Sequence, residues 1–361
     1  MIKVLIVEDS PVIQELLFYI LSSDPNIHVI GIANNGMEAI EMVKIKNPDV
    51  ITMDMHMPKL DGLKATRKIM ETMPTPIIIV SSTLAREEIN ETFQVMEAGA
   101  LAVLPRPAGI GHPDFHITSA ELINTIKLMS EVKVVRRWPH LSKQSVTSPN
   151  GLKQIITTTK SKSEKGIYHI VAIGASTGGP IVLQKILSLI GKDFPLPILI
   201  VQHIATGFLQ GFVEWLSQTT GVPIHVAAHH ELITAGNVYV APDSYHMGVD
   251  EEYRIILSKD KPENNLRPSI SFLFRSINNI YGKHAIGVLL TGMGTDGAEE
   301  LKLLKENSAA TIVQDEESSV VHGMAGKAIK LNGADYVLPP EKIAGVLKIL
   351  ADHNYSKNVT T

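Results

Sequence analysis

The chain has 361 residues, 44% of them hydrophobic, which suits two globular domains rather than one. Its formal net charge of −4 gives no global reason to expect nucleic-acid binding, and the absence of cysteine excludes disulfides, thiolate nucleophiles and cysteine-ligated zinc. No apolar run reaches the roughly 18 residues that span a bilayer, and the first apolar run is too short for a signal peptide. We therefore expect a soluble, cytoplasmic protein without direct membrane insertion.

The first 129 residues alternate apolar runs with amphipathic segments. Val12, Leu16 and Ile20 lie on one face of a predicted helix that begins at Ser10-Pro11. Continuous apolar runs are typical of parallel strands that are covered on both faces. The predicted strands are Lys3–Val7, Ile27–Ala33, Val50–Met53, Ile77–Val80 and Leu101–Leu104. This pattern predicts an α/β domain over residues 1–129, a doubly wound parallel sheet of (βα)5 type.

Residues 130–166 break the alternation. This stretch holds eight Lys or Arg against two Glu and has no sustained periodicity. We expect a basic, flexible linker, although a docking role for its positive charges stays open.

The alternation resumes in a second predicted domain, residues 167–354. Buried strands are predicted at Ile167–Ile173, Ile198–Val201, Ala285–Leu290 and Thr311–Val313, each followed by a helix. Between about 222 and 260 the runs become short, which predicts an antiparallel insertion or edge. These runs are Pro223–Ala227, Val238–Ala241 and Arg254–Leu257. The domain should be a three-layer, doubly wound α/β domain with a small antiparallel element.

Acidic side chains follow two strands of the first domain. Glu8 and Asp9 come after the first strand, and Asp54 comes after the third. Functional groups of an open α/β sheet gather beyond the carboxyl ends of its strands. Clustered carboxylates favour a hard divalent cation such as Mg²⁺, although a single acid at such a place commonly caps a helix. Ser81 ends the fourth strand, where its hydroxyl could bind an acyl-phosphate oxygen.

The stretch Asp54-Met-His-Met-Pro58, followed by Asp61-Gly62, resembles the turn after the phosphorylation site of response-regulator receiver domains. The resemblance covers the first 129 residues. It implies that Asp54 accepts a phosphoryl group and that Asp9 binds Mg²⁺ directly. It also implies that Glu8 acts through water and that the backbone carbonyl of His56 completes the metal site.

Two positions depart from the receiver pattern. Receivers usually carry Lys-Pro after the fifth strand, whereas this chain has Arg106-Pro107. Arginine keeps the positive charge near the phosphate but is a planar fork, so the exchange is not conservative. Val103 stands where many receivers carry an aromatic switch residue. Phosphorylation chemistry is expected to survive, and the coupling of phosphate to conformational change is the weaker expectation.

The second domain opens with Ile170-Val-Ala-Ile-Gly174-Ala-Ser176-Thr-Gly178-Gly179-Pro180. A buried strand, a tight Gly-rich turn and a Pro-started helix would place Ser176 on an exposed elbow beside a helix N-terminus. A phosphate-cradling loop and a purely structural turn are the alternatives. The sequence lacks the Gly-Lys-[Ser/Thr] signature and a well-spaced Gly-x-Gly-x-x-Gly, which disfavours the first alternative.

A nucleophilic serine needs a base, and the base needs a residue that orients it. His203 directly follows the strand Ile198–Val201, and Asp296 comes just past the strand Ala285–Leu290. Taken singly, this histidine could be structural and this aspartate could cap the next helix. Because all three side chains emerge at one edge of one sheet, we expect a Ser-His-Asp triad.

The oxyanion site is expected beside the serine. Met293 lies between Gly292 and Gly294, on a backbone that is free to aim N–H groups at an oxyanion. Thr177, next to the serine, is expected to support the same site.

Three motifs of the second domain occur in order: Gly-Ala-Ser-Thr-Gly-Gly-Pro, Val-Gln-His and Leu-Thr-Gly-Met-Gly-x-Asp-Gly-Ala. Together with Gln314-Asp-Glu-x-Ser-x-Val-Val-x-Gly-Met, they resemble the catalytic domain of chemotaxis protein-glutamate methylesterases. The resemblance covers residue 167 to about 350. It implies hydrolysis of glutamate γ-methyl esters on chemoreceptor helices, with glutamine deamidation by the same acyl-enzyme. It further implies a phosphodonor histidine kinase and Mg²⁺ in the receiver domain only, while the net charge predicts no nucleic-acid partner.

The two-domain order implies a switch. We hypothesise that the unphosphorylated first domain covers the edge that carries the triad. Two other functions stay open: a receiver-gated serine hydrolase of a non-chemotaxis protein, and a phosphorylation-gated binding module without catalysis. The departures at Arg106 and Val103 leave room for the first, and the intact Ser176, His203 and Asp296 argue against the second.

Overall fold

The computed structural model describes residues 1–81, 86–132, 134 and 167–358. They form two compact units, one on each side of residues 135–166. The linker predicted over residues 130–166 lies almost wholly outside the described residues.

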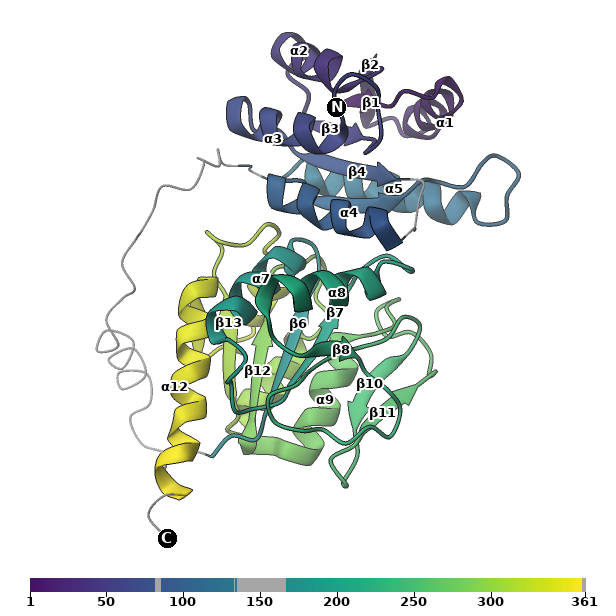
Figure 1. Ribbon diagram of the computed structural model, residues 1–361. Helices are drawn as coiled ribbons and strands as arrows, with labels where there is room; N and C mark the ends of the chain where they lie inside the picture. Colours follow the sequence, from purple (N-terminus) through teal and green to yellow (C-terminus); the bar gives the residue numbers. More distant parts are fainter. Residues whose placement is uncertain (82–85, 133, 135–166, 359–361) are drawn as a thin grey trace. The chain divides into compact units, whose positions relative to one another are not determined.

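The first unit is a parallel sheet of five strands in the order β2-β1-β3-β4-β5 (Figure 1). Its elements are β1 (Ile2–Val7), α1 (Pro11–Ser22), β2 (Ile27–Ala33), α2 (Gly36–Lys46), β3 (Val50–Met53), α3 (Gly62–Thr72), β4 (Ile77–Ser81), α4 (Arg86–Ala98), β5 (Ala102–Pro105) and α5 (Phe115–Met129). The apolar runs of β3 and β4 are buried throughout, as strands covered on both faces must be. The predicted (βα)5 fold is confirmed.

Helices cover both faces of this sheet. α1 packs with α5 on one side, and α2, α3 and α4 pack side by side on the other. The chain leaves β1 toward β2 and returns on the far side of β1 to form β3. This reversal places the carboxyl ends of β1 and β3 next to each other, at the point where an open α/β sheet forms its binding crevice.

The second unit has seven parallel strands in the order β14-β13-β12-β6-β7-β9-β8 and a separate antiparallel pair, β10 with β11. Its elements are β6 (Ile170–Ala175), α7 (Gly179–Ile190), β7 (Ile198–Gln202), α8 (Leu209–Thr220), β8 (Ile224–Val226), β9 (Val238–Val240), β10 (His246–Val249), β11 (Ile255–Ser258), α9 (Ile270–Tyr281), η1 (Gly282–His284), β12 (Ala285–Leu289), α10 (Ala298–Glu306), β13 (Ala310–Gln314), α11 (Met324–Lys330), β14 (Tyr336–Leu338) and α12 (Pro340–Asn358). The expected antiparallel element is the β10–β11 pair, whereas β8 and β9 extend the parallel sheet.

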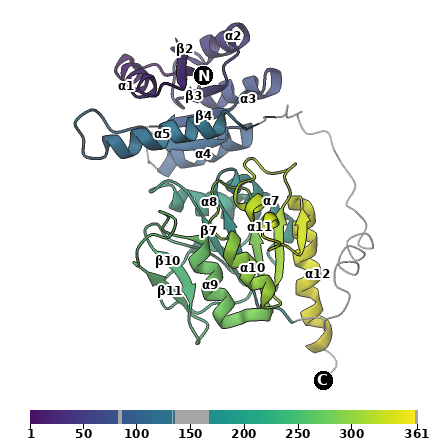
Figure 2. The ribbon, with the colours of Figure 1, turned by 180° about the vertical axis from the view of Figure 1, so that it is seen from behind.

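This second sheet is the middle of three layers. α7 contacts both α8 and α12 on one face, and α9, α10 and α11 pack together on the other, where Figure 2 shows α9 and α10 in front of the strands. Successive strands run from β6 to β7 in one direction and from β12 to β14 in the other. The reversal therefore lies between β6 and β12, and the carboxyl ends of β12, β6 and β7 form its crevice. Within the described residues, no helix combines the length and the apolar composition that crossing a membrane requires.

Candidate catalytic and phosphoacceptor sites

Ser176 directly follows β6, where the buried strand meets the N-terminus of α7. Its backbone N–H donates to the carbonyl of Thr291 at 3.0 Å, and its carbonyl accepts from Gly179 at 2.8 Å. The turn passes through Gly178 at a φ of +79°, where a Cβ would lie 2.6 Å from Val320. Only glycine suits both the dihedral angle and the space, so the Gly-rich motif shapes the elbow that carries Ser176.

His203 occupies the matching position on the next strand. Ala175 and Gln202 are register partners of β6 and β7, so the residues that follow them, Ser176 and His203, leave the sheet side by side. The backbone N–H of His203 donates to the carbonyl of Ala175 at 2.9 Å. The imidazole is 11% exposed, and its Nε2 lies 3.1 Å from Oδ2 of Asp296.

Asp296 is almost fully buried and lies at the N-terminus of α9. Its carboxylate accepts hydrogen bonds from the backbone N–H groups of Ile270 (2.6 Å) and Ser271 (3.2 Å) and from Oγ of Ser269 (2.9 Å). A helix N-terminus favours a negative charge. Burial alone would raise the pKa of Asp296, but His203 and these donors outweigh it and hold the pKa well below its usual range. The aspartate is therefore a permanent anion beside the imidazole at neutral pH.

Asp296 does not cap the helix that follows it, because the N-cap of α10 is Gly297. Its partners come instead from residues 264–271, a segment that the sequence analysis did not connect with the site. Asn264 adds a fourth donor at 3.3 Å. The local signal was present, since Ser269 follows a proline and precedes an apolar run of helical spacing, which predicts an N-cap.

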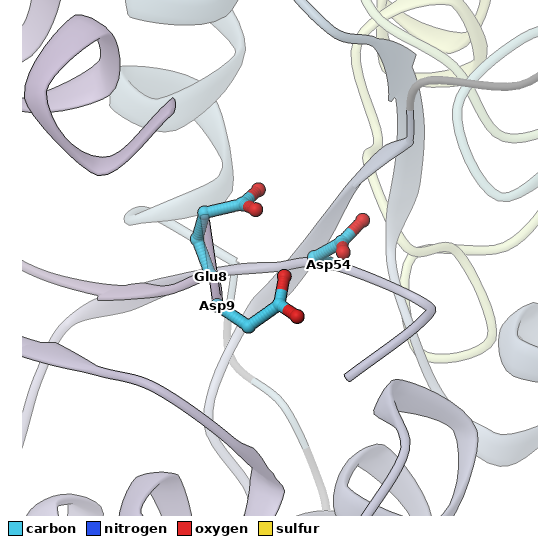
Figure 3. A group of neighbouring side chains, drawn as sticks. All are labelled: Glu8, Asp9 and Asp54. Carbon is cyan, nitrogen blue, oxygen red and sulfur yellow. The ribbon is translucent and has the colours of Figure 1, made fainter. Parts of the chain in front are cut away.

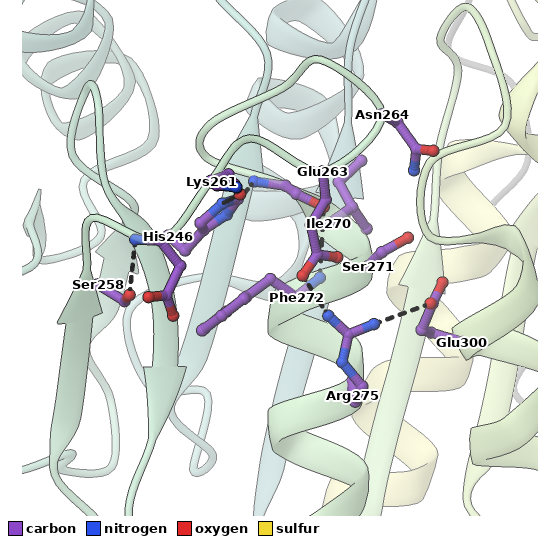
Figure 4. A network of polar contacts seen from close by, with 12 residues as sticks. His246, Ser258, Lys261, Glu263, Asn264, Ile270, Ser271, Phe272, Arg275 and Glu300 are labelled. Atoms are coloured by element: carbon purple, nitrogen blue, oxygen red, sulfur yellow. Dashed lines mark hydrogen bonds and ion pairs between the residues drawn. The ribbon is translucent and has the colours of Figure 1, made fainter.

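A surrounding polar network holds this segment in place. Arg275 of α9 lies between two carboxylates, pairing with Glu263 on one side and with Glu300 of α10 at 3.2 Å on the other (Figure 4). His246 of β10 accepts the N–H of Ser269 at 3.2 Å and contacts the carbonyl of Lys261 at 3.1 Å. The antiparallel pair and α10 thus both hold the α9 N-terminus that surrounds Asp296.

The contact between the serine and the histidine is looser than the contact between the histidine and the aspartate. Within the described part of the chain, Oγ of Ser176 and the imidazole of His203 form no hydrogen bond. Such bonds are often long in a site without substrate and tighten when substrate binds. The structure thus brings His203 and Asp296 into contact and places Ser176 at the adjacent strand end.

The residues predicted for the oxyanion site border the serine. A Cβ on Gly292 would lie 2.5 Å from Cβ of Ser176, so the loop after β12 packs directly against the serine. The N–H of Gly292 is occupied by the carbonyl of Val321, and the side chain of Met293 is 40% exposed. The carbonyl of Thr177 accepts from Thr291 at 2.9 Å, which ties the serine turn to the same loop.

The three acids of the first unit lie together at the carboxyl ends of β1 and β3 (Figure 3). One carboxylate oxygen from each of Glu8, Asp9 and Asp54 lies within 4.8 Å of the others. Glu8 and Asp54 are buried and Asp9 is exposed. Hard carboxylate oxygens at this spacing suit a divalent cation, so these residues fit the expected Mg²⁺ site.

Arg106 supplies the positive charge of this pocket. Its Nη2 lies 3.2 Å from Glu8 and 3.4 Å from Asp54, so one guanidinium nitrogen bridges both buried carboxylates. Burial and then the charge of Asp54 raise the pKa of Glu8 to about 7. Burial also raises the pKa of Asp54, and the opposing charge of Arg106 only partly offsets it.

The other predicted pocket residues lie at neighbouring strand ends. Ser81 ends β4 and is buried, and its carbonyl accepts the N–H of Arg106 at 2.8 Å. His56 follows Asp54 by two residues, and its side chain points to a different partner, with Nε2 3.7 Å from Glu91. Only the backbone of His56 was expected to take part in the metal site, and nothing in the side-chain contact conflicts with that.

Comparisons with known proteins match both units of the chain. The family model of the response regulator receiver domain matches residues 4–112, and that of the CheB methylesterase matches residues 171–347. A protein-glutamate methylesterase/protein-glutamine glutaminase of Nitrosospira multiformis is 54% identical over 358 residues, covering 99% of each chain. One of Syntrophus aciditrophicus is 53% identical over 352 residues, covering 97% of this chain and 99% of its own.

Among solved structures, the CheB methylesterase catalytic domain of Thermotoga maritima is 37% identical. It matches 51% of this chain and 98% of its own length, with a TM-score of 0.49. The alignments with the two relatives run over nearly the whole of both chains and so include both regions that the family models match. The chain therefore belongs to the CheB protein-glutamate methylesterase family, in the form in which a response-regulator receiver domain precedes the catalytic domain.

Proposed function

We propose that this protein is a phosphorylation-regulated serine hydrolase that removes γ-methyl esters from glutamates of chemoreceptor helices and deamidates glutamines there. The observation that carries this proposal is the imidazole of His203, 3.1 Å from the buried carboxylate of Asp296 and beside Ser176 at the next strand end. The names of the relatives, protein-glutamate methylesterase/protein-glutamine glutaminase, support this substrate class.

In this proposal the two imidazole nitrogens have different roles. Nε2 of His203 faces Asp296, which leaves Nδ1 to accept the proton of Ser176 Oγ. The serine oxygen then attacks the γ-carbonyl carbon and forms a tetrahedral oxyanion. His203 returns the proton to the methoxide oxygen, which leaves as methanol, or to the departing amide nitrogen of glutamine, which leaves as ammonia. Water, deprotonated by His203, hydrolyses the acyl-enzyme to free glutamate.

The negative charge of Asp296 holds the imidazole in the correct tautomer and stabilises its protonated form. Because four donors fix the carboxylate, the imidazole is oriented before substrate arrives. The developing oxyanion needs N–H donors beside Ser176, and Met293 and Thr177 are the proposed source. Loss of one such donor typically costs about 2.7–4 kcal/mol of transition-state stabilisation.

The first unit supplies regulation in this proposal. Asp54 accepts a phosphoryl group from a histidine kinase, and Ser81 and Arg106 bind the phosphate oxygens. Glu8, Asp9, Asp54 and the carbonyl of His56 would hold Mg²⁺, which neutralises the charge of the incoming phosphoryl group when bound. The proposed extents are residues 1–129 for the receiver, 130–166 for the linker and 167–354 for the catalytic domain.

The direct test is methanol release from methylated receptor. We expect Ser176→Ala to abolish release, since no other nucleophile replaces the serine, whereas Ser188→Ala, at an exposed position of α7, should have no effect. Unchanged release from Ser176→Ala would show that this serine is not the nucleophile. Addition of a small-molecule phosphodonor should raise the release by the wild-type protein and not by Asp54→Asn.

A further inference from the structure

Gln202 is the last residue of β7 and lies between the two strand ends that carry Ser176 and His203. It is 3% exposed. Its Nε2 donates to the carbonyl of Ser176 at 2.9 Å and to the carbonyl of His203 at 2.7 Å. One amide group therefore donates hydrogen bonds to the main-chain carbonyls of both residues that are proposed as nucleophile and base.

The other end of this side chain has an unusual environment. Oε1 of Gln202 is buried and has no hydrogen-bond partner among the described residues. It lies against Gly179, where a Cβ would come within 2.1 Å of it. A buried acceptor without a partner is unfavourable, and this cost offsets part of the stabilisation that the two hydrogen bonds of the NH₂ group provide.

The orientation of the amide follows from its neighbours. If its two ends were exchanged, Oε1 would face two carbonyl oxygens, which can only accept hydrogen bonds. The NH₂ group must therefore face Ser176 and His203, and the unfavourable position of Oε1 is the consequence. The hydrogen bonds that the NH₂ group donates to the two carbonyls thus fix the orientation of the side chain.

Each of the two residues has other main-chain contacts. Ser176 is tied to Thr291, and His203 is tied to Ala175. The bond from His203 ends on Ala175, the residue before the serine, whereas the amide of Gln202 joins the carbonyls of Ser176 and His203 to each other. Loss of the amide should thus leave the sheet intact, but the distance between Oγ of Ser176 and the imidazole of His203 would no longer be fixed.

We propose that Gln202 is a positioning residue that sets the distance between the nucleophile and its base. This role rests on the proposed function of Ser176 and His203. It acts on the proton transfer between them, so it should affect kcat and leave KM unchanged. Displacement of a reacting group by about 1 Å can cost about 100-fold in rate.

Gln202→Glu tests this role because its charge state can be changed by pH. The ionised carboxylate has the shape of the amide but donates nothing and faces two carbonyl oxygens. We expect about 100-fold lower kcat on methylated receptor at pH 8, with KM within about twofold of wild type. The protonated form regains one O–H donor, and burial raises the pKa of such a carboxyl. The deficit relative to wild type at the same pH should therefore shrink as the pH is lowered.

Two further variants complete the experiment on the full-length protein. Gln202→Met keeps the volume and removes both donors without adding charge, so its kcat should be lowered to a similar extent at every pH. Gln218→Glu makes the same exchange at an exposed position of α8 and should match wild type throughout. A wild-type kcat in Gln202→Met, or a deficit in Gln202→Glu that does not change with pH, would overturn the proposal. Failure of the proposed function itself would appear separately, as activity in Ser176→Ala.

Discussion

At the scale of single residues, two buried carboxylates of this protein have pKa values that are shifted in opposite directions. Asp296 faces the N-terminus of α9 and an imidazole, and its pKa is held low although burial opposes this. Glu8 is equally buried but lies beside Asp54, and its pKa rises to about 7. Hydrogen-bond donors surround Asp296, whereas the like charge of Asp54 faces Glu8. The environment, not the residue type, thus decides the direction in which each pKa is shifted.

Asp296→Asn should lower both activity and stability. An asparagine offers no charge to stabilise the imidazolium and can favour the wrong tautomer, so we expect kcat to fall roughly 10³–10⁴-fold. Since the folded-state pKa is depressed, the carboxylate stabilises the fold above its unfolded pKa of about 4, and this contribution is lost as the pH falls through the folded pKa. Urea unfolding should show wild type more stable than the variant by about 2 kcal/mol at pH 7. The difference should shrink below about pH 4, and a constant difference would contradict this account.

Arg106→Met should strengthen Mg²⁺ binding to the first unit. Arg106 pairs with Glu8 and Asp54, the carboxylates that would face the cation, and its removal eliminates a like charge from the pocket. Calorimetric titration should show about tenfold tighter binding. Arg67→Met removes the same charge from an exposed position of α3 and should leave the affinity close to wild type. Equal affinities in all three proteins would show that Arg106 does not compete with the metal.

At the scale of elements, the α9 N-terminus connects the fold to the chemistry. Ser269 accepts the N–H of Phe272 as the N-cap of α9 and donates its hydroxyl to Asp296. The cap and the orienting anion are thus parts of one hydrogen-bonded group, which His246 contacts from the antiparallel pair. This contact gives the small β10–β11 element a role near the site, although neither strand carries a predicted catalytic residue.

Ser269→Ala should separate capping from catalysis when it is compared with Asp61→Ala. Both variants remove an N-cap side chain, at α9 and at α3, and each should cost about 1 kcal/mol of stability in its own unit. Only Ser269→Ala also removes a hydrogen bond from Asp296, so only it should lower kcat, by about tenfold. Methanol release and urea unfolding measure the two effects. Equal kcat in both variants would mean that the remaining donors suffice to orient Asp296.

At the scale of the whole molecule, the two units carry complementary chemistry on one chain. The first presents an acidic pocket, the proposed phosphoacceptor site, at the ends of β1 and β3, and the second presents Ser176 and its partners at the ends of β12, β6 and β7. A phosphoryl group can regulate hydrolysis only if the two states of the first unit differ in their interaction with the second. The proposed form of that interaction is occlusion of the catalytic edge by the unphosphorylated receiver.

A fragment of residues 160–361 tests occlusion. It should release methanol faster than the unphosphorylated full-length protein, and phosphorylation should bring the full-length protein toward the rate of the fragment. Allosteric coupling of the usual size corresponds to about 5- to 150-fold. Comparable thermal unfolding of the fragment and of the second unit within the full chain is the control for folding. A fragment that is equally active or less active would contradict occlusion.

Sequence patterns were most reliable where strands are long and buried. All five strands of the first unit and the central strands of the second were predicted within a few residues, because two-sided burial produces continuous apolar runs. β14 was missed because it has only three residues and Val337 is 45% exposed. β10 was missed because a histidine and a glycine interrupt its apolar character. Short strands depend on pairing with distant segments, which no local pattern records.

For the sites too, some features follow from local sequence patterns and others depend on contacts between distant segments. The sequence alone determined the fold class of both units, the elbow that carries Ser176, and the family, because these depend on local spacing and on ordered motifs. Only the tertiary structure showed that Asp296 binds the N-terminus of α9 and that Arg106 bridges Glu8 and Asp54. It alone placed the amide of Gln202 between Ser176 and His203. Most of these contacts join residues more than 25 positions apart, so they depend on strand order and register, which the chain acquires only when it folds.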